Sequence, residues 1–258
     1  MTIDLDAALE FAAESARGAG RIVMRDAGQV PDVRQKGRLD LVTRADLESE
    51  AYLIQRIAER FPSHAVHGEE RGAVERAAFN WYVDPLDGTL NYAHGVPVFS
   101  VAIAMTAGEE TLLGVVYDPT RDELFHARRD GGAFLDGTRL HVSEIATLDQ
   151  AVLGFSTHPF KLDAPVRTRY QSLLDRIGPR TQHLINLGSQ ALLIAYVAAG
   201  RLDGMLAVPL DPWSSPAARL LVREAGGTDE PVPGGPWPHP AGTVLVTNGR
   251  IRDELVGA

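Results

Sequence analysis

Apolar residues recur every three to four positions over the first sixty residues, which is the spacing of amphipathic helices. Residues 4–27 form one such segment, and Gly28 follows as a helix-ending residue. Thr43 to Phe61 forms a second. The apolar positions are Leu5, Leu9, Ala12, Ala16, Ala19 and Val23 in the first segment, and Leu47, Leu53, Ile54 and Ile57 in the second. The pattern predicts two helices.

From residue 64 to 142 the apolar residues instead form short runs separated by turn residues, which predicts strands. The predicted strands are Ala65–His67, Trp81–Val83, Ser100–Thr106, Leu112–Tyr117, Glu123–Ala127 and a hairpin around Asp136-Gly137. Because the connections are short, we expect a meandering, antiparallel sheet.

After residue 150 strands alternate with helices, which predicts an α/β half. The predicted strands are Ala151–Phe155, Gln182–Asn186, Gly204–Val208 and Thr243–Thr247; the helices are Pro165–Ile177, Ser189–Ala199, Ser215–Ala225 and Ile251–Val256. The proline-rich segment 231–240 is expected to be a loop. We therefore expect an N-terminal α+β half, residues 1–147, whose antiparallel sheet carries most candidate metal ligands. A C-terminal α/β half, residues 148–258, would complete a substrate cleft.

Composition limits the chemistry. The chain has 258 residues, 45% of them hydrophobic, so it can bury a sizeable core. It has no cysteine, so any metal must be bound by oxygen or imidazole. A formal charge of −9 argues against a general nucleic-acid or membrane-surface binder. With no basic-then-apolar leader and no run of about 18 apolar residues, the expected location is the cytoplasm.

The segment Asp84-Pro85-Leu86-Asp87-Gly88-Thr89 follows a predicted strand and carries the main candidate chemistry. Asp84 and Asp87 can converge on one point, and two carboxylates with a backbone carbonyl suit Mg²⁺. The backbone N–H groups of Gly88 and Thr89 suit a phosphate oxygen. An ordinary turn is the alternative, since Leu-Asp-Gly-Thr recurs at 135–138, where Asp-Gly predicts a hairpin turn.

Three further segments carry candidate groups. Glu69 and Glu70 follow the predicted strand Ala65–His67, where a solvated turn is the alternative. Thr43 and Asp46 have capping-box spacing, although a carboxylate at a helix start can also take a proton from a hydroxyl. Lys36 lies in a predicted open loop, either solvated or available to a phosphate.

Together these segments resemble the inositol monophosphatase family, relatives of fructose-1,6-bisphosphatase that are metal- and lithium-associated phosphomonoesterases. The markers, in family order, are Lys36, residues 40–46, Gly68-Glu69-Glu70, residues 81–92, Gly114-Val115-Val116-Tyr117 and Glu224-Ala225-Gly226-Gly227. The resemblance covers nearly the whole chain and implies a layered α-β-α-β-α sandwich, Mg²⁺ as the cofactor and a homodimer.

The resemblance also implies roles for these residues. Glu69, Asp84 and the Leu86 carbonyl would hold one Mg²⁺, and Asp84 and Asp87 would share a second. Thr89, hydrogen-bonded to Asp46, would polarise a metal-held water that attacks phosphorus in line, so the implied catalytic residues are Thr89, Asp46 and Glu69.

The phosphate and the substrate have their own implied contacts. Gly88 and Thr89 would fix the phosphate through backbone N–H groups. Gly188, Ser189 and Gln190, at a predicted helix start, would line the substrate pocket and donate hydrogen bonds.

Two positions depart from the family pattern. The family's Trp-Asp pair falls on Trp213-Ser214, so the aspartate that completes the second metal site is a serine. Asp211 stands three residues earlier as a possible substitute, and Ser214 is expected to cap the next helix. The expected consequences are a weaker second metal and reduced lithium sensitivity. The position where inositol-binding members carry an acidic residue is Ala207, so the carboxylate that would bind a polyol hydroxyl is missing.

The preferred function is a Mg²⁺-dependent phosphomonoesterase acting on a small phosphorylated polyol such as an inositol monophosphate, with no nucleic-acid or membrane partner. Histidinol phosphate, fructose bisphosphate and a 3'-phosphonucleotide are alternative substrates. A non-catalytic phospho-ligand-binding protein with a degraded metal site is the alternative from another class. A haloacid-dehalogenase-type phosphatase is excluded because Pro85 stands two residues before Asp87, where that class needs a nucleophilic aspartate.

Overall fold

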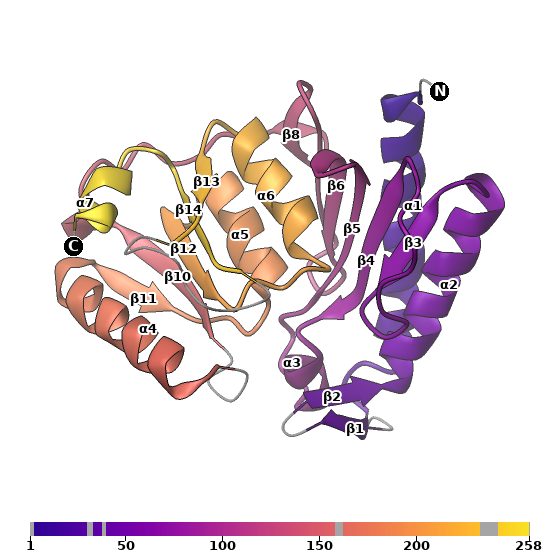
Figure 1. The fold of residues 1–258 in the computed structure, drawn as a ribbon, viewed down its shortest axis with the longest axis horizontal. Helices are drawn as coiled ribbons and strands as arrows, with labels where there is room; N and C mark the ends of the chain where they lie inside the picture. The colour runs from indigo at the N-terminus through magenta and orange to yellow at the C-terminus, as the bar shows by residue number, and fades with distance from the viewer. Residues whose placement is uncertain (1–2, 30–32, 38–39, 158–161, 233–241, 258) are drawn as a thin grey trace.

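The fold contains seven α-helices and fourteen strands in the part of the chain that the computed structural model describes, residues 3–29, 33–37, 40–157, 162–232 and 242–257 (Figure 1). The helices are α1 (Leu5–Arg25), α2 (Arg44–Arg60), α3 (Thr89–Ala93), α4 (Ala164–Ile177), α5 (Gln190–Ala198), α6 (Ser215–Glu224) and α7 (Arg252–Val256). The strands are β1 (Val33–Gly37), β2 (Asp40–Thr43), β3 (Ala65–Gly68), β4 (Asn80–Asp87), β5 (Ser100–Ala107), β6 (Glu110–Asp118), β7 (Glu123–Arg128), β8 (Gly132–Leu135), β9 (Thr138–Arg139), β10 (Val152–Thr157), β11 (His183–Ile185), β12 (Gly204–Val208), β13 (Thr228–Glu230) and β14 (Val244–Thr247).

Two large sheets organise the molecule. The first has seven strands in sequence order, β3 to β9, and every neighbouring pair is antiparallel except β3 and β4. The predicted meander is therefore confirmed. The second sheet has the order β11-β10-β12-β14-β13, with β10 parallel to both its neighbours and β14 antiparallel to its own. The β1–β2 hairpin and the short strand β13 were not predicted. The predicted loop 231–240 lies largely outside the described residues.

The sheets and helices alternate in layers, which confirms the predicted sandwich. Figure 1 shows α1 and α2 on one face of the first sheet, α5 and α6 between the two sheets, and α4 beyond the second. Strand β5 explains this order, because its successive side chains point to opposite faces. Val101, Ile103 and Met105 pack with α1 and α2, whereas Ala102 and Ala104 pack with α5 and α6. Because both faces of such a strand are buried, its successive residues are apolar, which explains the continuous apolar runs in the sequence.

Helix α5 is apolar on nearly every side because it lies between the two sheets. Its residues from Gln190 to Ala195 are all buried, and Ala191 to Ala195 belong to a cluster that includes Ala104 of β5 and Met205 of β12. The position of its first turn is thereby fixed relative to both sheets. None of the helices in the described ranges is long and apolar enough to cross a membrane. The division of the chain at residue 147 stays a prediction.

Candidate active site

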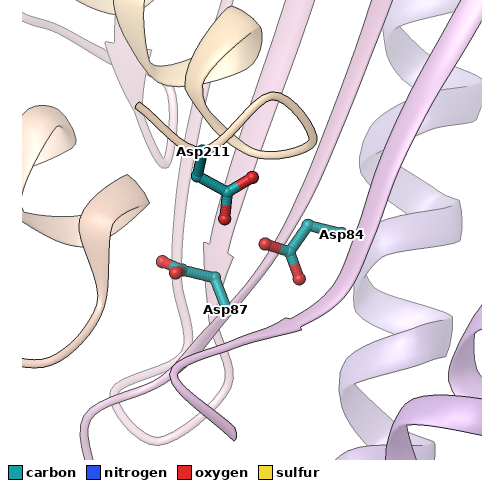
Figure 2. A group of neighbouring side chains, drawn as sticks. All are labelled: Asp84, Asp87 and Asp211. Carbon is teal, nitrogen blue, oxygen red and sulfur yellow. The ribbon is translucent and has the colours of Figure 1, made fainter. Parts of the chain in front are cut away.

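Asp84, Asp87 and Asp211 meet where β4 ends beside the loop that follows β12 (Figure 2). One carboxylate oxygen from each lies within 4.8 Å of the other two. Asp84 and Asp87 are three residues apart, so in a regular strand they would face opposite sides of the sheet. Here Asp84 pairs with Ala102 and Asp87 pairs with Ser100, so β4 has one more residue than β5 over this stretch. This irregularity brings both aspartates to one side.

The first turn of α5 holds Asp87. Its carboxylate accepts hydrogen bonds from Ser189 Oγ at 2.5 Å, Ala191 N at 2.8 Å and Gln190 N at 3.2 Å. Ser100 Oγ is a fourth donor, at 3.3 Å. Burial and then Asp211 raise the pKa of Asp87 to about 6, although the α5 donors lower it. The N-terminus of a helix stabilises a negative charge, so Asp87 is fixed in position with its ionised form favoured by α5.

Asp84 is fully buried and only half satisfied. Its Oδ1 accepts the N–H of Leu86 at 3.1 Å, while Oδ2 has no hydrogen-bond partner among the described residues. Burial raises the pKa of this carboxyl well above its usual value, and Glu69, Asp211 and Asp87 raise it further. An orphaned carboxylate oxygen beside two other carboxylates fits a hard cation, which takes oxygen ligands of this kind.

Glu69 and Glu70 follow β3, and both are ion-paired to Lys36. Lys36 Nζ lies 3.1 Å from Glu69 Oε1 and 2.5 Å from Glu70 Oε1. Burial lowers the pKa of Lys36, but the two glutamates outweigh it and the net shift is upward. Burial, followed by Asp211, raises the pKa of Glu69 to about 8 despite Lys36. In this structure Lys36 therefore binds the glutamates and is not a free ammonium in an open loop.

Glu50, which the sequence reasoning missed, sets the turn that carries this pair. Its carboxylate accepts the N–H groups of Glu70 at 2.8 Å and Arg71 at 2.7 Å. A Cβ at Gly68 would lie 2.4 Å from Glu50 Oε2, so only glycine allows this approach. The available signal was the inward spacing of Asp46, Ser49 and Glu50 with Leu53 and Ile57 on α2, which puts polar groups on a buried helix face.

Thr89, the first residue of α3, and Asp46, in the first turn of α2, come together although they are 43 residues apart in the chain. Thr89 Oγ1 lies 3.0 Å from Asp46 Oδ1 and 3.0 Å from the Leu86 carbonyl, and it can donate its one proton to either. Asp46 also forms the predicted capping box with Thr43, so its structural and candidate chemical roles coexist. Burial raises the pKa of Asp46, against hydrogen bonds from Thr43 and Thr89 that lower it. Thr89 follows Gly88, whose φ of 102° ends β4 and starts α3.

The three predicted substrate residues lie at the start of α5. Gly188 N donates to Asn186 Oδ1 at 2.9 Å. Ser189 Oγ bonds Asp87, and Gln190 Nε2 donates to the Pro209 carbonyl at 3.2 Å. The side chains of Ser189 and Gln190 thus bind protein groups in this structure, and their contact with a substrate stays a prediction.

Asp211 binds the turn that precedes α6, whereas the sequence predicted that Ser214 would cap this helix. Asp211 Oδ1 accepts the N–H of Trp213 at 2.7 Å and of Ser214 at 3.4 Å. Ser214 is fully buried, makes no capping bond, and its Oγ has no partner within the described residues. The capping prediction for Ser214 is therefore wrong. The backbone of Ser214 is helical, with φ −94° and ψ −31°, whereas a capping residue is normally extended.

The repeated Leu-Asp-Gly-Thr segment behaves as predicted. Asp136 and Gly137 have φ values of 47° and 81° and form the two-residue turn between β8 and β9, where Leu135 pairs with Thr138. Two positive φ values are the signature of a type I′ hairpin. The same four letters therefore build a turn in one place and an acidic site in another.

The fold is a layered α/β sandwich with an acidic site between its two sheets, and comparison with known sequences identifies its family. The model of the inositol monophosphatase family matches residues 4–258. Nus factor SuhB of Escherichia coli (strain K12) is 38% identical over 263 residues, covering 97% of each chain. The fructose-1,6-bisphosphatase/inositol-1-monophosphatase of Thermotoga maritima is 34% identical over 249 residues, covering 96% of this chain and 94% of the relative. A crystal structure of extragenic suppressor protein suhB from Bartonella henselae superposes with a TM-score of 0.88 at 33% identity, covering 97% of each chain.

The chain belongs to the inositol monophosphatase family, as the motifs predicted. The family and the relatives' names support a phosphatase activity.

Proposed function

We propose that this protein is a Mg²⁺-dependent phosphomonoesterase whose substrate is a small phosphorylated polyol. The observation that carries the proposal is the buried Asp84 Oδ2, orphaned among carboxylates and close to a Thr89–Asp46 hydrogen bond. Glu69, Asp84, the Leu86 carbonyl and Asp87 would hold the metal. When bound, Mg²⁺ lowers the pKa of its water and neutralises phosphoryl oxygens.

The protein's own groups would orient the attack. A Thr89 hydroxyl that donates to Asp46 keeps its lone pairs free, so it can accept a hydrogen bond from a water and align it. Asp46 is buried and its pKa is raised, which suits a group that takes up a proton through Thr89. The N–H groups of Gly88 and Thr89, at the start of α3, would fix the phosphate because the first N–H groups of a helix have no partner within it.

The polyol assignment is the finer part of the proposal. Position 207 is a fully buried alanine, so the carboxylate that family resemblance would use for a polyol hydroxyl is absent. We therefore propose a panel of inositol, sugar, histidinol and nucleotide monophosphates, assayed for phosphate release at rising Mg²⁺. Turnover of any of these supports the phosphomonoesterase, and the ranking identifies the leaving group.

A non-catalytic phospho-ligand protein is the competing function, and a relative named as a Nus factor gives it weight. The panel separates the two, because this alternative requires phosphate binding without turnover. The proposed homodimer is tested independently by light scattering.

Asp87→Asn is the sharpest variant test. Removing this charge should lower turnover at least ~100-fold, which corresponds to about 2.7 kcal/mol of transition-state stabilisation. Asp136→Asn, in the second Leu-Asp-Gly-Thr segment, is the matched control and should keep full activity. Equal activity of the two variants would remove the metal assignment of Asp87.

A further inference from the structure

Asp211 adds a third carboxylate to the Asp84–Asp87 pair, from a loop of the other sheet (Figure 2). We propose that Asp211 is a direct ligand of a divalent cation shared with Asp84 and Asp87, and that it supplies the carboxylate which family resemblance places at position 214. The inference rests on the proposed function for its biological meaning, but metal binding alone tests it.

The turn before α6 does not by itself explain an aspartate at this position. Only Oδ1 of Asp211 accepts the N–H groups of Trp213 and Ser214 in that turn. Oδ2 has no hydrogen bond from any residue in the described ranges. Asparagine or serine would make the same turn without a charge. A third negative charge beside two buried carboxylates adds repulsion, which a divalent cation removes.

A buried orphan oxygen points to a ligand here. Asp84 Oδ2 is unpartnered within the described part of the chain, and Figure 2 shows the Asp84 carboxylate directed toward Asp87 and Asp211. Ser214 Oγ is also buried and unpartnered, but a neutral hydroxyl is a poor substitute for a carboxylate ligand. Of the two positions, 211 therefore has the side chain with the required chemistry.

Gln190 holds Asp211 in place from α5. Its Oε1 accepts the N–H of Asp211 at 2.8 Å, and its Nε2 donates to the Pro209 carbonyl at 3.2 Å and to Ser156 Oγ at 3.3 Å. The same turn of α5 holds Asp87. One buried helix start therefore sets the positions of two of the three carboxylates, which is the preorganisation that a metal site needs.

The test is Mn²⁺ binding to the protein in the absence of substrate, measured by electron paramagnetic resonance and calorimetry. Asp211→Asn keeps a side-chain oxygen for the N–H groups of Trp213 and Ser214 and removes only the charge, so it should weaken the Mn²⁺ site at least ~10-fold or abolish it. The double variant Asp211→Asn/Ser214→Asp should recover most of the lost affinity, because it restores the carboxylate at the alternative position. Asp253→Asn, an exposed charge change on α7, should bind Mn²⁺ like the wild type.

Wild-type affinity in Asp211→Asn would overturn the inference, and so would a loss of affinity that the double variant fails to recover. Thermal unfolding without metal checks that each variant is folded. The outcomes also separate this inference from the proposed function. A protein whose Mn²⁺ site depends on Asp211 but which hydrolyses no phosphomonoester would keep the inference and lose the function. A protein that hydrolyses a phosphomonoester but whose Mn²⁺ affinity is unchanged in Asp211→Asn would keep the function and lose the inference.

Discussion

Glu69 makes the stability of the metal-free protein depend on pH in a direction that is easy to test. Burial, then Asp211, raises its pKa from an ordinary 4.5 to about 8, and its side chain is 22% exposed. A carboxyl whose pKa is higher in the folded state binds its proton more tightly when folded. Its contribution to stability is therefore complete below about pH 4.5 and is lost as the pH rises through 8.

The size of the effect follows from the same shift. While the folded protein keeps one proton that the unfolded chain has lost, each pH unit lowers the free energy of unfolding by about 1.4 kcal/mol. Asp87, with a pKa of about 6, acts in the same direction mainly between pH 3.8 and 6. From pH 6.5 to 7.5 Glu69 should therefore remove about 1 kcal/mol, or about 2–4 °C in Tm for a chain of this size.

The assay is thermal unfolding in chelator at pH 6.5 and 7.5, for the wild type and for Glu69→Gln. Glutamine resembles the protonated carboxyl and cannot titrate, so the variant should lack this part of the pH-dependent loss. Excess Mg²⁺ should reverse the trend in the wild type, because deprotonated carboxylates bind the metal and binding stabilises the folded state. Parallel changes in Tm for the two proteins in chelator would refute the reasoning about Glu69.

Two further substitutions test the packing around the site. Gln190→Met keeps the side-chain volume but removes the hydrogen bond to Asp211, so it should destabilise the protein by about 1–3 kcal/mol and weaken Mn²⁺ binding several-fold. An unchanged Mn²⁺ affinity in calorimetry would mean that Gln190 does not position Asp211. Gly114→Ala should lower the free energy of unfolding in denaturant by about 1–3 kcal/mol or more, since its Cβ would lie 2.7 Å from the Ala217 backbone. The control Gly178→Ala would make only ordinary contacts. Equal stabilities of the two variants would contradict the close packing of α6 on β6.

The layer order could be predicted because it follows from local periodicity. Residues 101–105 form an apolar run without polar alternation, which indicates a strand covered on both faces, and the structure buries Val101 and Ala102 against different helices. Two glycines among the family markers have structural reasons that only the fold shows. A side chain at Gly114 would meet the backbone of Ala217 in α6, and one at Gly68 would displace the carboxylate of Glu50.

The roles of Asp211, Ser214 and Gln190 could not be predicted because they depend on contacts between distant segments. The sequence shows Ser214-Ser215-Pro216, the ordinary composition of a helix start. It does not show that Asp211 Oδ1 binds the preceding turn or that the backbone of Ser214 is already helical. Gln190 looked like a substrate contact because it begins a helix. Its partners, Pro209 and Asp211, lie about twenty residues away in the chain and come close only when α5 packs against β12.

The site therefore depends on the packing of α5 between the two sheets more than on any single loop. Asp87 belongs to the first sheet and Asp211 to the loop after β12, yet both are bonded to the first turn of α5. That turn cannot shift without moving the buried residues Ala191 to Ala195, which contact both sheets. Because tightly packed interiors transmit strain, a change that loosens one sheet from α5 should separate the two carboxylates. The acidic cluster is thus a property of the assembled sandwich, and the cation affinity that we propose for it should disappear together with the packing of α5.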